Sequence, residues 1–76
     1  MTDSERKSFN VAFGNFIKNG RLDKGILQGE VSRHLGVSQA YYCYLEAGER
    51  SVDLQMANRI CRYLQLDLNK FLKKQK

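Results

Sequence analysis

The sequence predicts an all-α fold, a compact bundle of five short helices in one small domain. Apolar residues recur three and four positions apart along nearly the whole chain, and the strict alternation typical of strands is nearly absent. The chain contains no proline, the residue that most strongly breaks a helix interior. With 76 residues it can form only a small core, so dimerisation would help to stabilise it.

Residues 1–7 are polar, and we expect them to form a flexible segment or a frayed first turn. The first helix should span about 8–21, with Ser4 or Ser8 as its cap. Its apolar stripe consists of Phe9, Ala12, Phe13, Phe16 and Ile17.

Two glycines interrupt this first helix. Gly14 and Gly20 each weaken it by up to ~1 kcal/mol relative to alanine, but a glycine also lets another helix approach closely. We expect a loop at residues 22–25, with Gly25 as the stop.

The middle of the chain predicts two short helices joined by a tight turn, which is a helix-turn-helix candidate. The first spans about 28–35 and ends at Gly36, and we expect Val31, Leu35 and the following Val37 to face inward. Leu27 precedes this helix and offers no side-chain cap. The second lies between Ser38, a strong cap residue, and Gly48, which suits the left-handed close of a helix.

The helix after the turn has two different faces. Tyr42, Leu45 and Glu46 share the face that we expect to pack inward. The opposite face carries contact groups: Gln39, Ala40, Cys43 and Tyr44. We therefore interpret this helix as a recognition element that the rest of the chain holds in place.

Two further helices complete the domain at 8–72. Asp53 caps a helix at 54–64, and Asp67 caps a short one at 68–72. Their expected buried residues are Leu54, Ala57, Ile60, Cys61 and Leu64, followed by Leu68, Phe71 and Leu72. Residues 73–76 form a basic tail.

Thirteen Lys and Arg against eight Asp and Glu leave a net charge of +5. This charge favours a polyanionic partner, nucleic acid first and an anionic membrane surface second. No apolar run approaches the ~20 residues that span a bilayer, and the N-terminus leads into no signal-peptide core, so we expect a cytoplasmic protein with no membrane partner.

The chemistry-bearing residues predict no enzyme, no cofactor and no small-molecule ligand. Cys43, Cys61 and the single histidine, His34, are too few and too scattered for a metal site, and we expect reduced thiols. Cys43 is interpreted as a surface thiol, with a redox switch as the alternative. Glu30 and Glu46 fit a helix cap and an ion pair better than a catalytic carboxylate pair.

Several stretches together resemble a known family. They are Gly25 to Gln39, Leu45-Glu46-Ala47-Gly48-Glu49-Arg50 (similar to the signature I/L-E-x-G-x-R), Phe13-Gly14 with Ile17-Lys18, and Leu66-Asp67-Leu68. The chain resembles the Cro/cI-type, lambda-repressor-like or XRE, helix-turn-helix family over residues 9–72. This resemblance implies sequence-specific binding of double-stranded DNA, with the helix after the turn in the major groove.

The resemblance also implies roles for individual residues. The implied base contacts are Gln39, Ala40, Cys43 and Tyr44. The implied phosphate contacts are Gln28, Tyr41, Arg50, Ser51, Lys24 and Arg33. Arg21 and Glu46 match a structural ion pair, and Tyr42 matches a core position. Gly20 replaces a core leucine of the family, so the first helix would end early or Leu22 would take over.

We therefore expect a small transcriptional regulator, a repressor that binds a palindromic operator as a homodimer. The candidate dimer surface comprises Tyr63, Leu66, Phe71 and Leu72. The alternative hypothesis is a protein-interaction module, antitoxin-like or adaptor, that uses the tyrosine-rich face of the third helix.

Overall fold

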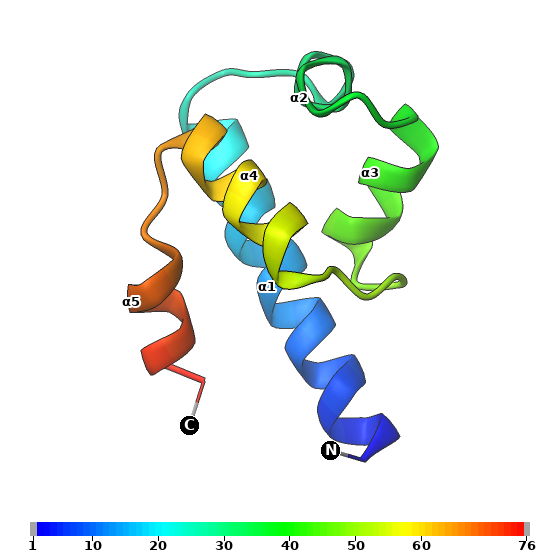
Figure 1. Cartoon of the computed structure of the whole chain (residues 1–76), viewed down its shortest axis with the longest axis vertical. Helices are drawn as coiled ribbons and strands as arrows, with labels where there is room; N and C mark the ends of the chain where they lie inside the picture. The colour runs from blue at the N-terminus through cyan, green and yellow to red at the C-terminus, as the bar shows by residue number, and fades with distance from the viewer. Residues whose placement is uncertain (1, 76) are drawn as a thin grey trace.

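The computed structural model describes residues 2–75, and within them the chain forms five helices and no strand (Figure 1). The helices are α1 (Asp3–Asp23), α2 (Gln28–Leu35), α3 (Gln39–Ala47), α4 (Leu54–Leu64) and α5 (Leu68–Lys73). The long α1 packs against α3 and α4, while α2 bridges α3 and α4 and α5 closes the far side of α4. The predicted all-α bundle of five helices is confirmed. No helix among these residues is long and apolar enough to cross a membrane.

The predicted helix caps of the second half of the chain are confirmed. Ser38 Oγ accepts a hydrogen bond from the Tyr41 backbone N–H at 3.0 Å. Asp53 and Asp67 cap α4 and α5 in the same way, through bonds of 2.7 Å and 3.0 Å. Each bond satisfies a backbone donor that a helix start leaves free, so α3, α4 and α5 begin where the cap residue dictates.

Leu27 provides no side-chain cap to α2, as expected. The carboxylate of Glu30 accepts a hydrogen bond from the Leu27 backbone N–H at 3.2 Å instead. Glu30 is thus the helix-cap residue that the sequence indicated, and it compensates in part for the missing hydroxyl.

The expected start of α1 at residue 8 is wrong, because the helix already begins at Asp3. Thr2 and Glu5 form a reciprocal capping box. The Glu5 N–H donates to Thr2 Oγ1 at 3.1 Å and the Thr2 N–H donates to Glu5 Oε1 at 3.2 Å. This box satisfies two backbone donors at once, so neither Ser4 nor Ser8 caps the helix. Of the segment 1–7 that we expected to be flexible, residues 3–7 are helical and Met1 lies outside the described residues.

Gly20 does not shorten α1, which continues to Asp23. Leu22 does not replace the missing leucine either, since its side chain is 54% exposed. Leu66 fills the place instead, because a Cβ on Gly20 would lie 2.6 Å from Leu66 Cδ1. A leucine from the α4–α5 connection thus supplies the apolar contact that α1 lacks.

The core forms where α1, α2, α3 and α4 meet. Its fully buried side chains include Phe13, Ile17, Val31, Tyr42, Leu45, Ile60, Cys61 and Leu64. Phe71 of α5 closes one end by contacting Phe9, Phe13 and Phe16, with the nearest ring centroid, that of Phe16, at 4.6 Å.

Two residues that we expected to be buried lie largely outside this core. Leu54 is 72% exposed and Leu72 is 37% exposed. Leu54 follows directly after the cap of α4, and the buried stripe of that helix begins one turn later, at Ala57.

Candidate nucleic-acid interface

The turn between α2 and α3 is tight, and backbone hydrogen bonds from Gly36 and Val37 hold it to α2. Gly36 adopts the left-handed conformation, with φ of 74°, that only glycine adopts without strain. The Val37 N–H donates to the Ser32 carbonyl at 3.0 Å, and the Val37 side chain packs against the core. This turn sets the direction in which α3 leaves α2.

The structure separates the two faces of α3 as the sequence predicts. Tyr42, Leu45 and Glu46 are buried. The four predicted base-contact residues, Gln39, Ala40, Cys43 and Tyr44, are all exposed and share the opposite side of the helix, where Ala47 continues the same face. We call these five residues the outer face of α3. Base contact itself stays a prediction.

Arg21 and Glu46 form a buried, two-pronged ion pair beneath α3. Arg21 Nε lies 2.6 Å from Glu46 Oε2, and Nη2 lies 3.0 Å from Oε1. The two side chains are 8% and 3% exposed. The remaining nitrogen, Nη1, donates to the Ile26 carbonyl at 2.8 Å, so one guanidinium ties α3 to the end of α1 and to the loop before α2.

The Glu46 carboxylate also accepts a hydrogen bond from Gln28 Nε2 at 3.0 Å. Burial favours the neutral carboxyl, but the hydrogen bonds from Arg21 and Gln28 outweigh it and lower the pKa of Glu46. The side-chain amide of Gln28, predicted to contact a phosphate, is therefore turned toward the ion pair. Its second N–H is the donor that remains for such a contact.

Gln28, Arg33 and Gln39 line one open hollow at the start of α2. Gly29 also lines the hollow, and a Cβ there would make ordinary contacts, 3.4 Å from Gln39 Oε1 and 3.6 Å from Arg33 Nη1. A predicted base contact and two predicted phosphate contacts thus meet at one end of α3. Lys24 is exposed just beyond α1 and does not line this hollow.

Of the other predicted phosphate contacts, Arg50 and Ser51 lie in the loop after α3, whereas Tyr41 lies in the first turn of that helix. The guanidinium carbon of Arg50 sits 5.6 Å from the centre of the half-buried Tyr41 ring. Ser51 follows in the same loop, and its Oγ accepts a hydrogen bond from Asn10 Nδ2 at 3.2 Å. Residues that could contact a backbone therefore flank both ends of the outer face.

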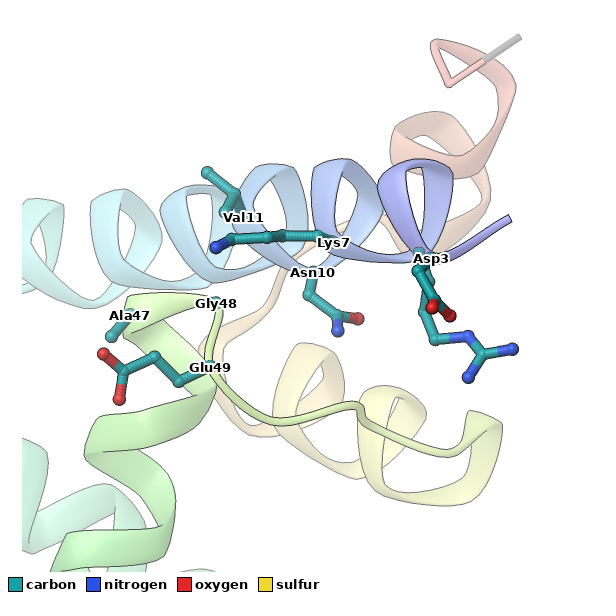
Figure 2. Close-up of a pocket in the computed structure, with 8 residues that line it drawn as sticks. Asp3, Lys7, Asn10, Val11, Ala47, Gly48 and Glu49 are labelled. Atoms are coloured by element: carbon teal, nitrogen blue, oxygen red, sulfur yellow. The ribbon is translucent and has the colours of Figure 1, made fainter. Parts of the chain in front are cut away.

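Asn10 is a residue of this region that sequence reasoning missed. It belongs to an open hollow of about 460 Å³ between α1 and the end of α3, where it points toward the loop after Gly48 (Figure 2). Asp3, Arg6, Lys7 and Glu49 also line this hollow, so its formal charges cancel. No local signal in the sequence indicates this contact, because Asn10 already lay inside the expected helix and its partner, Ser51, is 41 residues away.

The remaining reactive side chains do not form a second centre. Both thiols are free: Cys43 is exposed, whereas Cys61 is buried, and burial raises its pKa to about 11. The His34 ring stacks on Tyr63 with centroids 4.0 Å apart. Within residues 2–75, no three His, Cys, Asp or Glu side chains come together in a way that could hold a metal ion.

Comparison with known proteins supports the same interpretation. A family profile described as helix-turn-helix matches residues 17–71, which covers α2 to the middle of α5 and the last turns of α1. Comparison with the curated proteins gave no match. The profile match covers most of the chain, and the chain therefore belongs to the Cro/cI-type (XRE) helix-turn-helix family of DNA-binding transcription regulators.

Proposed function

We propose that this protein represses transcription by binding a palindromic operator as a homodimer, with α3 in the major groove. The observation that carries the proposal is the outer face of α3: it is exposed along its whole length while the opposite face is locked to α1 by the Arg21–Glu46 pair. A helix held in this way can enter a groove about 12 Å wide without losing its own packing.

The chemistry of the outer face suits duplex DNA. A glutamine amide at Gln39 can pair with adenine through two hydrogen bonds, and the methyl group of Ala40 can contact a thymine methyl. The Tyr44 hydroxyl can donate to or accept from a base edge. Arg50 and Ser51 at one end, and Gln28 and Arg33 at the other, then suit the phosphates on both sides of the groove.

Homodimerisation follows from the small number of contacts available. Four predicted base contacts on a nine-residue helix read only a few base pairs, and two copies on adjacent half-sites, ~34 Å apart, would double that number. Of the four candidate dimer residues, the structure uses Leu66 against Gly20, Tyr63 against His34, and Phe71 in the aromatic cluster. Leu72 is the one that stays exposed.

The protein-interaction alternative depended on a tyrosine-rich surface. In the structure Tyr42 is buried and Tyr41 is half-buried beside Arg50, which leaves Tyr44 as the exposed aromatic residue of α3. One aromatic side chain makes a small contact surface, so this observation favours DNA as the partner of α3.

Binding of duplex DNA at increasing salt tests the proposal. Each phosphate contact from a cationic side chain releases counterions, so we expect log K to fall with log salt by about 0.9 per contact. Affinity that does not respond to salt, or no binding at low salt, would rule out the proposed mode. Selection of bound sites from a random duplex pool should recover a palindrome; recovery of a single half-site would contradict the homodimer.

Two variants separate base contacts from phosphate contacts. Gln39→Ala should relax preference at one base pair by ~1–3 kcal/mol, whereas Arg50→Ala should weaken all sequences alike and reduce the salt slope by about one. Identical behaviour of the two variants would refute this division.

Matched controls are available outside α3 and its flanking residues. Arg62→Ala removes the same charge from α4, where Arg62 lines a hollow with His34 and Tyr63 that no residue of α3 lines, and Gln75→Ala removes an amide beyond α5. We expect both to bind like the unmodified protein, measured by fluorescence anisotropy on one duplex and on its single-base variants.

A further inference from the structure

The N-terminal part of α1 lies outside the residues that match the family profile. The match begins at residue 17, whereas α1 begins at Asp3. These extra helical turns are packed rather than free: the Phe9 and Phe13 rings contact Phe71, and Val11 contacts Gly48 so closely that a Cβ on Gly48 would lie 2.7 Å from the Val11 Cα. The extension therefore lies directly against the end of α3.

Asn10 provides the polar contact between this extension and the α3–α4 loop. It is half-buried, and its Nδ2 donates to the exposed Ser51 Oγ at 3.2 Å (Figure 2 shows Asn10 directed toward the loop). The two residues are 41 positions apart in the chain. The contact thus joins the part of α1 that precedes the profile match to a residue proposed to contact DNA.

The direction of this hydrogen bond decides what the serine hydroxyl can do. A serine hydroxyl has one donor hydrogen and two acceptor lone pairs, and an amide nitrogen can only donate. While Ser51 Oγ accepts from Asn10, its own hydrogen stays available to an acceptor outside the protein. A phosphate oxygen is such an acceptor, and a hydrogen bond to a charged group is stronger than one between neutral groups.

We propose that Asn10 is a positioning residue: it holds the Ser51 hydroxyl so that the hydroxyl donates to a DNA phosphate. Through Asn10 the N-terminal extension of α1 takes part in the DNA-binding site without touching DNA. This inference rests on the proposed function and adds a residue that neither the family profile nor the predicted contact residues include.

A double-mutant cycle on duplex affinity tests the proposal. We expect Ser51→Ala to weaken binding by roughly 10- to 100-fold, the range for loss of one hydrogen bond to a charged group. Asn10→Ala should cause a similar loss, and the double variant should bind no more weakly than either single one, because both remove the same contact. Asn15→Ala, at an exposed position of the same helix, is the matched control and should bind normally.

A second set of variants separates positioning from simple structural support. Ser51→Thr keeps the hydroxyl and should keep the affinity. Asn10→Asp has the shape of asparagine, but its carboxylate can only accept a hydrogen bond, so it should turn the Ser51 hydroxyl inward and weaken binding more than Asn10→Ala does. The additional loss of affinity in Asn10→Asp, relative to Asn10→Ala, should shrink when residue 51 is alanine. A purely structural effect would cause the same additional loss in both backgrounds.

Thermal melting of each variant accompanies the binding measurements. If Asn10→Ala lowers Tm strongly, the affinities of Ser51→Ala and Ser51→Thr still show whether the Ser51 hydroxyl contributes to binding. Ser51 lies in a loop, so we expect these two variants to keep the helices intact. Additive losses at the two sites, or normal binding by Ser51→Ala, would overturn the positioning role while leaving DNA binding intact. Failure of the unmodified protein to bind any duplex would overturn the proposed function together with this inference.

Discussion

Glu46 points into the protein from the helix whose other face is exposed, and three hydrogen bonds meet its carboxylate. Two come from Arg21 and one from Gln28. The neighbouring Tyr42 side chain is fully buried, and burial, assisted by the Glu46 charge, raises the pKa of its hydroxyl. Such a network anchors α3 only while it is complete, since a buried charge that loses its partner is strongly unfavourable.

Glu46→Gln leaves the buried Arg21 guanidinium without its counter-charge, and we expect the free energy of unfolding at pH 7 to fall by ~3 kcal/mol. Urea unfolding followed by circular dichroism measures it. Glu49→Gln changes the same chemical group at an exposed site and should stay within about 0.5 kcal/mol of the unmodified protein.

The pH dependence of stability follows from the same carboxylate. Because the pKa of Glu46 in the folded state is below its usual value of 4.5, the unfolded chain takes up this proton at higher pH than the folded chain does. The contribution of Glu46 is therefore present above pH 4.5 and is lost as pH falls through the folded pKa. Unfolding at a series of pH values should show that the free energy of unfolding decreases less steeply toward acid pH in Glu46→Gln than in the unmodified protein. An equally steep decrease would contradict the lowered pKa of Glu46.

At the scale of elements, the packing of α1 against α3 depends on a glycine. A Cβ on Gly14 would collide with the carbonyl oxygens of Leu45 and Glu46, which are backbone atoms that cannot move aside without disturbing α3. Gly20 faces the flexible end of Leu66, and Gly29 faces Gln39 at an ordinary contact distance. The three helical glycines therefore tolerate a methyl group to different degrees.

Alanine substitution at these three glycines should give a graded series. In an exposed helix each change would stabilise by up to ~1 kcal/mol. Here we expect Gly14→Ala to destabilise clearly, by ~1–3 kcal/mol as for overpacked cores, Gly20→Ala to destabilise less, and Gly29→Ala to be neutral or mildly stabilising. Chemical denaturation of the three variants tests the order, and a stabilised Gly14→Ala would show that α1 and α3 are not in such close contact.

At the scale of the whole molecule, one of the two cysteines lies on the surface and the other in the core. Cys43 lies on the outer face of α3, and Cys61 is 1% exposed in the core, where burial raises its pKa to about 11. Thiolate is the reactive form, so both accessibility and protonation protect Cys61 in the native state.

We expect a bulky alkylating reagent at pH 7 to modify one thiol in the native protein and two in urea, as counted by mass spectrometry. The adduct on Cys43 would fill the space that a DNA base pair needs, so modified protein should lose duplex binding. Cys43→Ser should make binding resistant to the reagent. Retained binding after modification of Cys43 would show that DNA does not approach the outer face of α3.

Most of the helix boundaries could be predicted because their signals are local. Ser38, Asp53 and Asp67 each bond to a backbone N–H only three residues away, and Gly36 and Gly48 end helices through their own φ angles. The signal for the early start of α1 is just as local, in Thr2 and Glu5, but Ser4 and Ser8 are competing cap residues nearer the apolar stripe. The outer face of α3 followed from helical periodicity alone.

The contacts that complete the site could not be predicted from the residues, because they join distant positions. Asn10 meets Ser51 across 41 residues and Arg21 meets Glu46 across 25; spacing indicates neither, and the second pair was expected only through the family resemblance. Leu66 fills the place of a side chain at Gly20, and Leu54 stays exposed, because of how α1 crosses the other helices. Local hydrogen bonding and periodicity thus determined the helices and the outer face of α3, whereas only the tertiary packing decided which side chains hold that helix and the loop beside it in place.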